Sequence, residues 1–308
     1  MLEYHHVCDL KSDWPTPAIR LEANVNRMYD QNEALIFLHI PKAGGSTLYK
    51  ILEQHYPRSQ TVKVDSLQAA RFKTLPAEER GRYRLLQGHV YFGLHRFIPR
   101  ASTYITFLRR PVERVVSFYY YARSTANHYL YPVLAAEPLD LKTVLARDLT
   151  EELRNGQTRL LAGDEWEDPQ RAVTEAALEQ AKTNLRTHFR VVGLLEEFDA
   201  SLLLLRRAFG WDLPFYLKDN VTKEKPPDTS LDIETRKLIE DANSLDLELY
   251  EFARNLFDAQ LRAAGDSFAA DLDNFRRLNA DYARSSLSFA TPFRWVFRRL
   301  QQSLSFNH

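Results

Sequence analysis

The chain has 308 residues with 41 basic and 41 acidic side chains, so its net charge is zero and nothing global indicates nucleic-acid binding. Cys8 is the only cysteine, which excludes an intramolecular disulfide and a cysteine metal cluster. No apolar run approaches the roughly 18 residues of a membrane span. Residues 1–15 also lack a signal-peptide pattern, so we expect a cytoplasmic protein.

A polar lead-in, residues 1–33, with a short helix near 19–29, precedes the first strong pattern. There, an apolar run at 35–40 ends in a turn that leads into a helix reaching about residue 56; the turn residues are Pro41, Lys42, Ala43, Gly44, Gly45, Ser46 and Thr47. Strand, glycine turn and helix start together favour a cradle for a phosphate or sulfate. It is not a Walker A loop, because the lysine precedes the glycines.

The following elements alternate between strands and helices. We expect strands at 61–64, 85–90, 103–108 and 189–194, and helices at 66–75, 111–123, 139–149, 150–161, 168–188 and 196–209. Ser66 is the expected cap of the second helix, residues 76–83 form a charged connector, and 211–230 form a loop. Residues 231–283 are expected to be helical with breaks near 244 and 265.

This alternation predicts an α/β fold: a P-loop-like central parallel sheet flanked by helices, with a largely helical C-terminal part. We divide the chain into a lead-in at 1–33, a main domain at 34–265 and a helical extension at 266–308. In parallel sheets, ligands bind beyond the carboxyl ends of the strands.

A second candidate anion site follows the strand at 103–108. Arg109 ends this strand, and Ser117 lies two helical turns later, which suits a second phosphate of the same ligand. The alternative is that Arg109 pairs with Glu113 and Ser117 only packs. We expect Arg110 and Arg114 to be solvated or structural.

His89 comes at the end of another strand that is expected to point to the same edge. A histidine there could act as a general base, although position alone favours a structural role. We expect His39 to be a packed residue of the first strand, and we consider Arg80, His95 and Arg96 as either acceptor contacts or plain surface residues.

Four segments carry a family resemblance: HIPKAGGST, QGHVYF, ITFLRRPVERVVSFYYYAR and NGQTRLLAG. They resemble the carbohydrate sulfotransferases that use 3′-phosphoadenosine 5′-phosphosulfate (PAPS), in particular the heparan sulfate 2-O-sulfotransferase-like group. The resemblance extends over about residues 35–260.

The resemblance implies that residues 41–47 bind the 5′-phosphosulfate and that Arg109 and Ser117 bind the 3′-phosphate. It implies that Thr222 and Lys223 close over the nucleotide and that His89 is the catalytic base. One position departs from the group, which carries a second histidine where this chain has Gln87. The two-histidine arrangement and the acceptor therefore need not be shared, and Gln87 joins the candidate acceptor contacts.

The reaction implied is sulfuryl transfer to a hydroxyl of a glycan or glycolipid, with His89 as base, Lys42 at the leaving phosphate and no metal. Two alternatives stay open. One is a P-loop nucleotide kinase, which the order of lysine and glycines disfavours. The other is a PAPS-binding module without catalysis, which Gln87 keeps open.

The C-terminal segment 284–308 is basic and amphipathic. It has no acidic residue but contains Arg284, Arg294, Arg298 and Arg299, and its apolar face consists of Phe293, Val296, Phe297, Leu300 and Leu304. Such a helix could lie peripherally on the inner membrane surface. We favour the alternative, a terminal helix docked on the protein itself or on a partner subunit.

Overall fold

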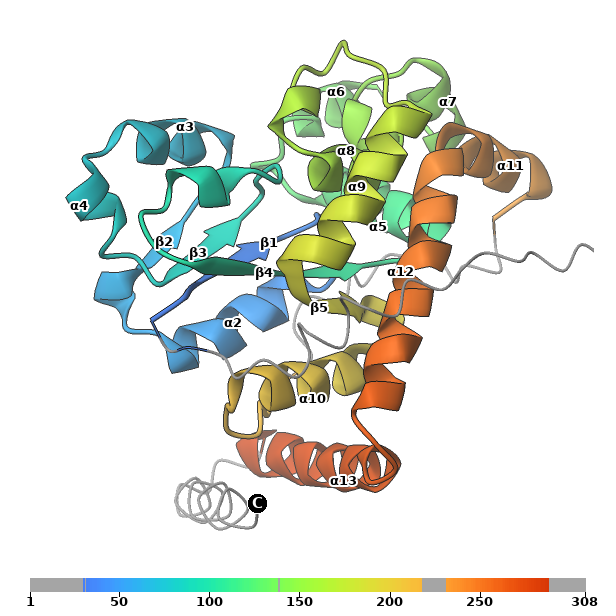
Figure 1. Cartoon of the computed structure of the whole chain (residues 1–308). Helices are drawn as coiled ribbons and strands as arrows, with labels where there is room; N and C mark the ends of the chain where they lie inside the picture. The colour runs from blue at the N-terminus through green and yellow to red at the C-terminus, as the bar shows by residue number, and fades with distance from the viewer. Residues whose placement is uncertain (1–29, 31, 138, 218–230, 288–308) are drawn as a thin grey trace, which may run out of the picture.

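The computed structural model describes residue 30 and residues 32–137, 139–217 and 231–287 (Figure 1). The helix expected near 19–29, the nucleotide-closing residues Thr222 and Lys223, and the tail beyond 287 lie outside the described residues.

Five parallel strands form the centre of the molecule in the order β2-β3-β1-β4-β5. The strands are β1 (Ala34–Leu38), β2 (Thr61–Lys63), β3 (Leu85–Gly88), β4 (Ser102–Leu108) and β5 (Phe189–Leu194). Every residue of β1 is buried, as expected for a parallel strand with both faces covered. The α/β fold with a P-loop-like central sheet, predicted from the sequence, is confirmed.

Helices cover both faces of this sheet. In Figure 1, α2 and α10 lie below the sheet and α8 and α9 lie above it. The longer helices are α2 (Gly45–His55), α3 (Ser66–Thr74), α5 (Pro111–Ser124), α9 (Glu175–His188), α10 (Phe198–Phe209), α11 (Ile233–Ala242), α12 (Ser244–Ala263) and α13 (Phe268–Leu287). The short ones are α4 (Ala77–Arg80), α6 (Tyr131–Ala136), α7 (Leu141–Ala146) and α8 (Gly156–Ala162), with 3₁₀ turns η1 (Arg58–Gln60), η2 (Leu94–Phe97), η3 (Glu151–Leu153), η4 (Asp164–Trp166) and η5 (Leu195–Glu197).

The strand register brings the predicted motifs to one edge. Leu38 pairs with Gly88 on one side of β1, and Phe37 pairs with Ile105 on the other. The carboxyl ends of β1, β3 and β4 therefore meet, and the segments that follow them carry Lys42, His89 and Arg109. This edge is the place where parallel sheets bind ligands.

Several helix boundaries differ from the expectation. The helix expected at 168–188 begins only at Glu175, because the buried Arg159 holds the preceding turn through the main-chain carbonyls of Trp166, Asp168 and Arg171. The segment 150–161 is not one helix, since Asn155 has a left-handed φ of 49° that separates η3 from α8.

Two further corrections concern helix starts. The cap of α3 is Asp65 rather than Ser66, because the Asp65 carboxylate accepts hydrogen bonds from the N–H groups of Leu67 and Gln68. The charged connector at 76–83 contains the short helix α4, which begins after Pro76.

The C-terminal part is helical with breaks at the two predicted places, between α11 and α12 and between α12 and α13. Phe268 and Phe275 of α13 are buried in the same apolar core as the sheet, so this helix packs on the main domain. The boundary that we placed between residues 265 and 266 stays a prediction. None of the described helices is long and apolar enough to cross a membrane.

Candidate active site

The turn after β1 has the backbone of an anion cradle. Gly44 has a left-handed φ of 86° and is the N-cap of α2, and having no side chain it cannot cap the first-turn N–H groups. At Gly45, a Cβ atom would lie 1.9 Å from Nε2 of His39, so only glycine fits there. The N-terminus of α2 therefore offers unpaired donors and a positive dipole end to an anion.

Lys42 is held in an unusual conformation beside this helix start. Its φ of 69° is left-handed, which costs a non-glycine residue about 1–2 kcal/mol. Its Nζ atom lies 3.8 Å from the centre of the Tyr121 ring on α5. Strain of this kind is typical of functional positions.

Arg109 and Lys42 lie next to each other, as the strand register predicts. The Arg109 guanidinium donates a hydrogen bond from Nη1 to the main-chain oxygen of Lys42 over 3.0 Å. Burial, followed by the charge of Arg109, lowers the pKa of Lys42 to about 8. Two cations held together in this way favour an anion between them, because it would relieve their repulsion.

Ser117 and Tyr121 lie one turn apart on α5, which begins directly after β4. Ser117 is buried, and Tyr121 is partly exposed under the Lys42 ammonium group. Ser117 therefore lies on the same face of α5 as the Tyr121 ring that contacts Lys42.

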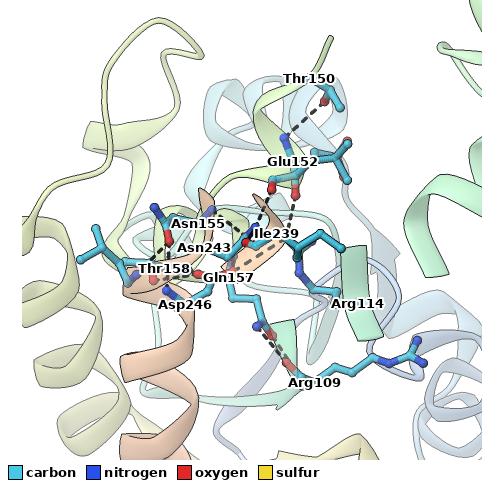
Figure 2. Close-up of polar contacts among 12 residues, drawn as sticks. Arg109, Arg114, Thr150, Glu152, Asn155, Gln157, Thr158, Ile239, Asn243 and Asp246 are labelled. Atoms are coloured by element: carbon cyan, nitrogen blue, oxygen red, sulfur yellow. Dashed lines mark hydrogen bonds and ion pairs between the residues drawn. The ribbon is translucent and has the colours of Figure 1, made fainter. Parts of the chain in front are cut away.

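Gln157 holds the main chain of Arg109, and the sequence did not reveal this. Its side-chain Oε1 accepts from the Arg109 N–H over 3.0 Å, and its Nε2 donates to the Arg109 carbonyl over 2.9 Å. Figure 2 shows the Arg109 guanidinium extending away from this contact. Gln157 is fully buried, so it orients Arg109 without reaching a ligand itself.

A buried polar network fixes Gln157 in turn (Figure 2). Asp246 at the start of α12 accepts hydrogen bonds from the N–H groups of Gln157 and Thr158 and from the Thr158 hydroxyl, over 3.1, 2.7 and 2.8 Å. It also forms an ion pair with Arg114 of α5 over 3.7 Å, in which both side chains are buried. The structural role expected for Arg114 is confirmed.

Asn155 and Asn243 complete the network. The Asn155 side chain accepts from the N–H groups of Leu245 and Asp246, so it caps α12, while Asn243 accepts from the Asn155 N–H. The only signal of this network in the sequence is the polar start of NGQTRLLAG, whose partners lie some 90 residues further along the chain.

His89 directly follows β3 and has a defined tautomer. Its Nδ1 atom lies 3.0 Å from the main-chain oxygen of His39, which can only accept, so Nδ1 carries the proton. Nε2 of the neutral ring then has a free electron pair. Burial lowers the pKa of His89, while the bond to His39 and the charge of Asp65 oppose this, so the ring is neutral near pH 7. It can therefore accept a proton at Nε2.

Gln87 does not reach this edge. Its side chain is fully buried in the centre of the sheet, and its Nε2 donates to Glu53 of α2 over 3.3 Å. A side chain with no exposed surface that is bound to a residue of α2 does not reach an acceptor. We therefore correct the expectation of an acceptor contact at Gln87.

His95, Arg96 and Arg80 are also placed away from the edge. The His95 ring contacts the hydroxyl of Tyr104 over 3.0 Å, about 13 Å back along β4 from its carboxyl end. Arg96 donates to both carboxylate oxygens of Asp164. Arg80 donates to the main-chain carbonyls at the end of α3 and just after it. The structure does not bring these three residues to Lys42, and their side chains are used in structural contacts.

In the described part of the chain, no group of three or more histidine, cysteine, aspartate or glutamate side chains is placed to hold a metal ion. The metal-free reaction stays a prediction. Asp65, which caps α3, is an acidic side chain close enough to raise the pKa of the proposed base.

A model of the galactose-3-O-sulfotransferase family matches residues 3–288. The chain belongs to this family. It is 26% identical to human galactose-3-O-sulfotransferase 2 over 190 residues, which are 59% of this chain and 47% of the relative. It is 28% identical to mouse uronyl 2-sulfotransferase over 204 residues, 59% of this chain and 49% of that protein. The chain thus spans about half the length of the curated relatives it matches.

Among solved structures, the chain is similar to a mouse sulfotransferase, SULT7A1, complexed with PAP. The TM-score is 0.42 at 13% identity, with 78% of this chain and 94% of that chain covered. A likeness this loose does not bear on the site. Membership of the galactose-3-O-sulfotransferase family confirms the resemblance to carbohydrate sulfotransferases that four sequence segments indicated.

Proposed function

We propose that this galactose-3-O-sulfotransferase family member transfers a sulfuryl group from PAPS to a hydroxyl of a carbohydrate. One observation carries the proposal: Lys42, the uncapped start of α2, Arg109 and the free Nε2 of His89 come from three strand ends that meet at one edge of the sheet. The names of the curated relatives, which are carbohydrate sulfotransferases, support the same reaction.

The nucleotide fits the cations and donors of this edge. The turn at Pro41–Thr47 and the first N–H groups of α2 would hold the 5′-phosphosulfate. Arg109 and Ser117 would hold the 3′-phosphate at the other end of the ligand. Closure by Thr222 and Lys223 stays part of the proposal. The neighbouring cations Lys42 and Arg109 are the observation that fits an anionic ligand.

The transfer needs one proton acceptor and one group that stabilises the leaving phosphate. His89 Nε2 takes the proton of the acceptor hydroxyl, whose oxygen forms a new bond to sulfur. The bond between sulfur and the bridging phosphate oxygen breaks, and the Lys42 ammonium neutralises the charge that develops on that oxygen. The products are the sulfate ester of the carbohydrate and adenosine 3′,5′-bisphosphate (PAP). Positioning of the two reactants provides the rest of the rate enhancement.

We propose a neutral sugar at the reacting position. Tyr91, two residues beyond His89, has its pKa raised to about 12 by burial, which Arg159 opposes, while the charges of Glu151, Glu167 and Glu152 raise it further. The Arg159 guanidinium donates hydrogen bonds to the main-chain carbonyls of Trp166, Asp168 and Arg171, so it is already engaged within the protein. Three carboxylates and one cation act on Tyr91, and this excess of negative charge disfavours an acidic sugar, because like charges repel.

The test is transfer of ³⁵S from labelled PAPS to a panel of neutral galactosides and uronate-containing oligosaccharides. We expect label on neutral galactosides. Transfer of ³²P from γ-labelled ATP would instead establish a kinase. Tight PAPS binding without transfer to any member of the panel would support a binding module, and label on uronates alone would contradict the neutral acceptor.

A further inference from the structure

The chain lacks a histidine two residues before His89, but it has another histidine beside it. The ring of His39, directly after β1, stacks on the His89 ring with centroids 4.3 Å apart and planes 29° apart. Because β1 and β3 are neighbours in register, residues 39 and 89 lie side by side beyond the strand ends. The second histidine of this edge therefore comes from the neighbouring strand, which no local sequence pattern shows.

The packing around His39 leaves its ring one orientation. Phe37 stacks on it at 5.3 Å, and the Tyr49 ring of α2 meets its edge at 5.0 Å and 88°. The Tyr49 hydroxyl lies 2.8 Å from His39 Nδ1. The backbone of Gly45 closes the side of Nε2, and only 7% of His39 is exposed. A ring enclosed on every side is a rigid platform.

The main chain of His39 adds two contacts to the same partner strand. Its N–H donates to the Gly88 carbonyl over 2.9 Å, and its own carbonyl accepts from His89 Nδ1 over 3.0 Å. The backbone thus fixes which His89 nitrogen carries the proton, and the side chain fixes the plane in which the other nitrogen lies.

His39 stays uncharged, so it does not oppose a positive charge on His89. Burial, then the proximity of His89 and of Lys42, lowers the pKa of His39 well below its ordinary value. The groups that face the pair are Lys42 on the glycine turn, Tyr49 on α2 and Asp65 before α3. Two stacked imidazoles do not both take a proton, because like charges repel. His39 stays neutral, and the pair accepts its one proton at His89.

We propose that His39 is a positioning residue for His89: its neutral ring holds the His89 ring in the plane that directs Nε2 toward the acceptor hydroxyl. The inference rests on the proposed role of His89 as base. It assigns to His39, directly after β1, the orientation of the His89 ring that stacks on it.

The test compares His39→Ala with His39→Phe. Alanine removes the platform, and phenylalanine keeps a flat ring of similar size without the nitrogens. For His39→Ala, we expect kcat to fall about 10- to 100-fold while the Kd for PAP changes less than twofold. His39→Phe should recover most of kcat. If the cavity left by alanine prevents folding, His39→Leu fills the space without a flat face and should show the same loss.

A second readout needs no acceptor. Histidine ¹⁵N–¹H spectra of the whole chain report the tautomer and the pKa of the His89 ring. The His39 carbonyl that holds the proton on Nδ1 is present in every variant, so we expect this tautomer throughout and read the effect of the His39 ring from the pKa of His89. In His39→Ala, water reaches the face of the His89 ring that His39 covers. The pKa of His89 and the acidic limb of kcat/KM should therefore move up toward the ordinary value, whereas His39→Phe should keep both near those of the wild type.

His95→Ala is the matched control, because His95 is also packed among aromatic rings but lies away from the edge. It should leave the His89 spectrum and the pH profile unchanged. An unchanged His89 pKa and an unchanged kcat in His39→Ala would overturn the inference. If His89→Ala itself retained full activity, the proposed base would be wrong, whereas the spectra would still decide whether His39 positions the ring.

Discussion

Single residues give this edge of the sheet its chemistry. His89 offers one nitrogen with a free electron pair because a main-chain carbonyl holds the proton on the other. The pKa of Lys42 is lowered to about 8 by burial and by the charge of Arg109, so its ammonium group loses its proton more readily than that of an ordinary lysine. Both features come from neighbours distant in sequence, so the residue types alone indicate the reaction class but not the protonation states.

Replacing His89 by alanine should separate catalysis from binding. Removing a general base typically costs about 10²–10⁴ in rate, because the acceptor oxygen then attacks with its proton still in place. We expect kcat of sulfuryl transfer to fall by this factor, with PAP affinity by calorimetry near that of the wild type. Full activity of His89→Ala would exclude His89 as the base.

The lowered pKa of Lys42 predicts a pH dependence of nucleotide affinity. An anion favours the protonated amine, which predominates below about pH 8 and is lost as the pH rises through that value. The Kd for PAP should therefore be flat from pH 6 to 7.5 and increase above pH 8, with proton uptake on binding above pH 8.

Calorimetry in buffers of different ionisation enthalpy measures both quantities. The variant Lys42→Met should bind more weakly and should lose this step in affinity. A step of the same size in Lys42→Met would show that another group causes it.

At the scale of elements, two helices far apart in sequence position the end of one strand. α8 supplies Gln157 to the main chain of Arg109, and the start of α12 supplies Asp246 to the start of α8 (Figure 2). The α8–α12 contact is thus part of the support of the candidate 3′-phosphate site.

Gln157→Ala should weaken nucleotide binding although Gln157 touches no ligand. The main chain of Arg109 loses two buried hydrogen bonds, each worth roughly 0.5–1.5 kcal/mol, so Arg109 becomes less well oriented. We expect the Kd for PAP to rise about 3- to 10-fold, together with a loss of stability in urea denaturation.

Asn184→Ala is the control for this change. Asn184 is another buried amide, which donates to the carbonyls of Leu161 and Ala162 over 2.8 and 3.0 Å away from the edge. It should cost similar stability but leave the Kd unchanged. An equal loss of PAP affinity in both variants would show that Gln157 affects binding only through the stability of the fold.

For the whole molecule, the buried pair of Arg114 and Asp246 joins the C-terminal helices to the sheet domain. Neither side chain is exposed by more than 1%, and the two residues come from α5 and α12. Removing one partner of such a pair leaves a buried charge without compensation, which is costly.

Asp246→Ala should therefore lower the free energy of unfolding by about 3–5 kcal/mol, measured by urea denaturation. The double variant Arg114→Met, Asp246→Ala should recover part of this loss, because no unpaired charge is then buried. A double variant as unstable as the sum of both single variants would show that the ion pair is not the cause.

The amino-acid pattern alone predicted the α/β class, the order of strands and helices, the glycine turn with Lys42, and Arg109 and His89 at strand ends. These features depend on local patterns: apolar runs, the glycine pair, and side chains directly after a strand. The cap at Asp65 and the late start of α9 escaped it, because a hydrogen bond and the distant Arg159 decide them.

The set of residues that lie together at the candidate site follows from the folded chain and not from local patterns. The fold placed His95 at Tyr104, far back along β4, bound Arg96 to Asp164, and enclosed Gln87. It brought His39 against His89 and Gln157 against Arg109. The physical reason is that strand register and helix packing join residues 48 to 88 positions apart, and no local periodicity encodes such contacts.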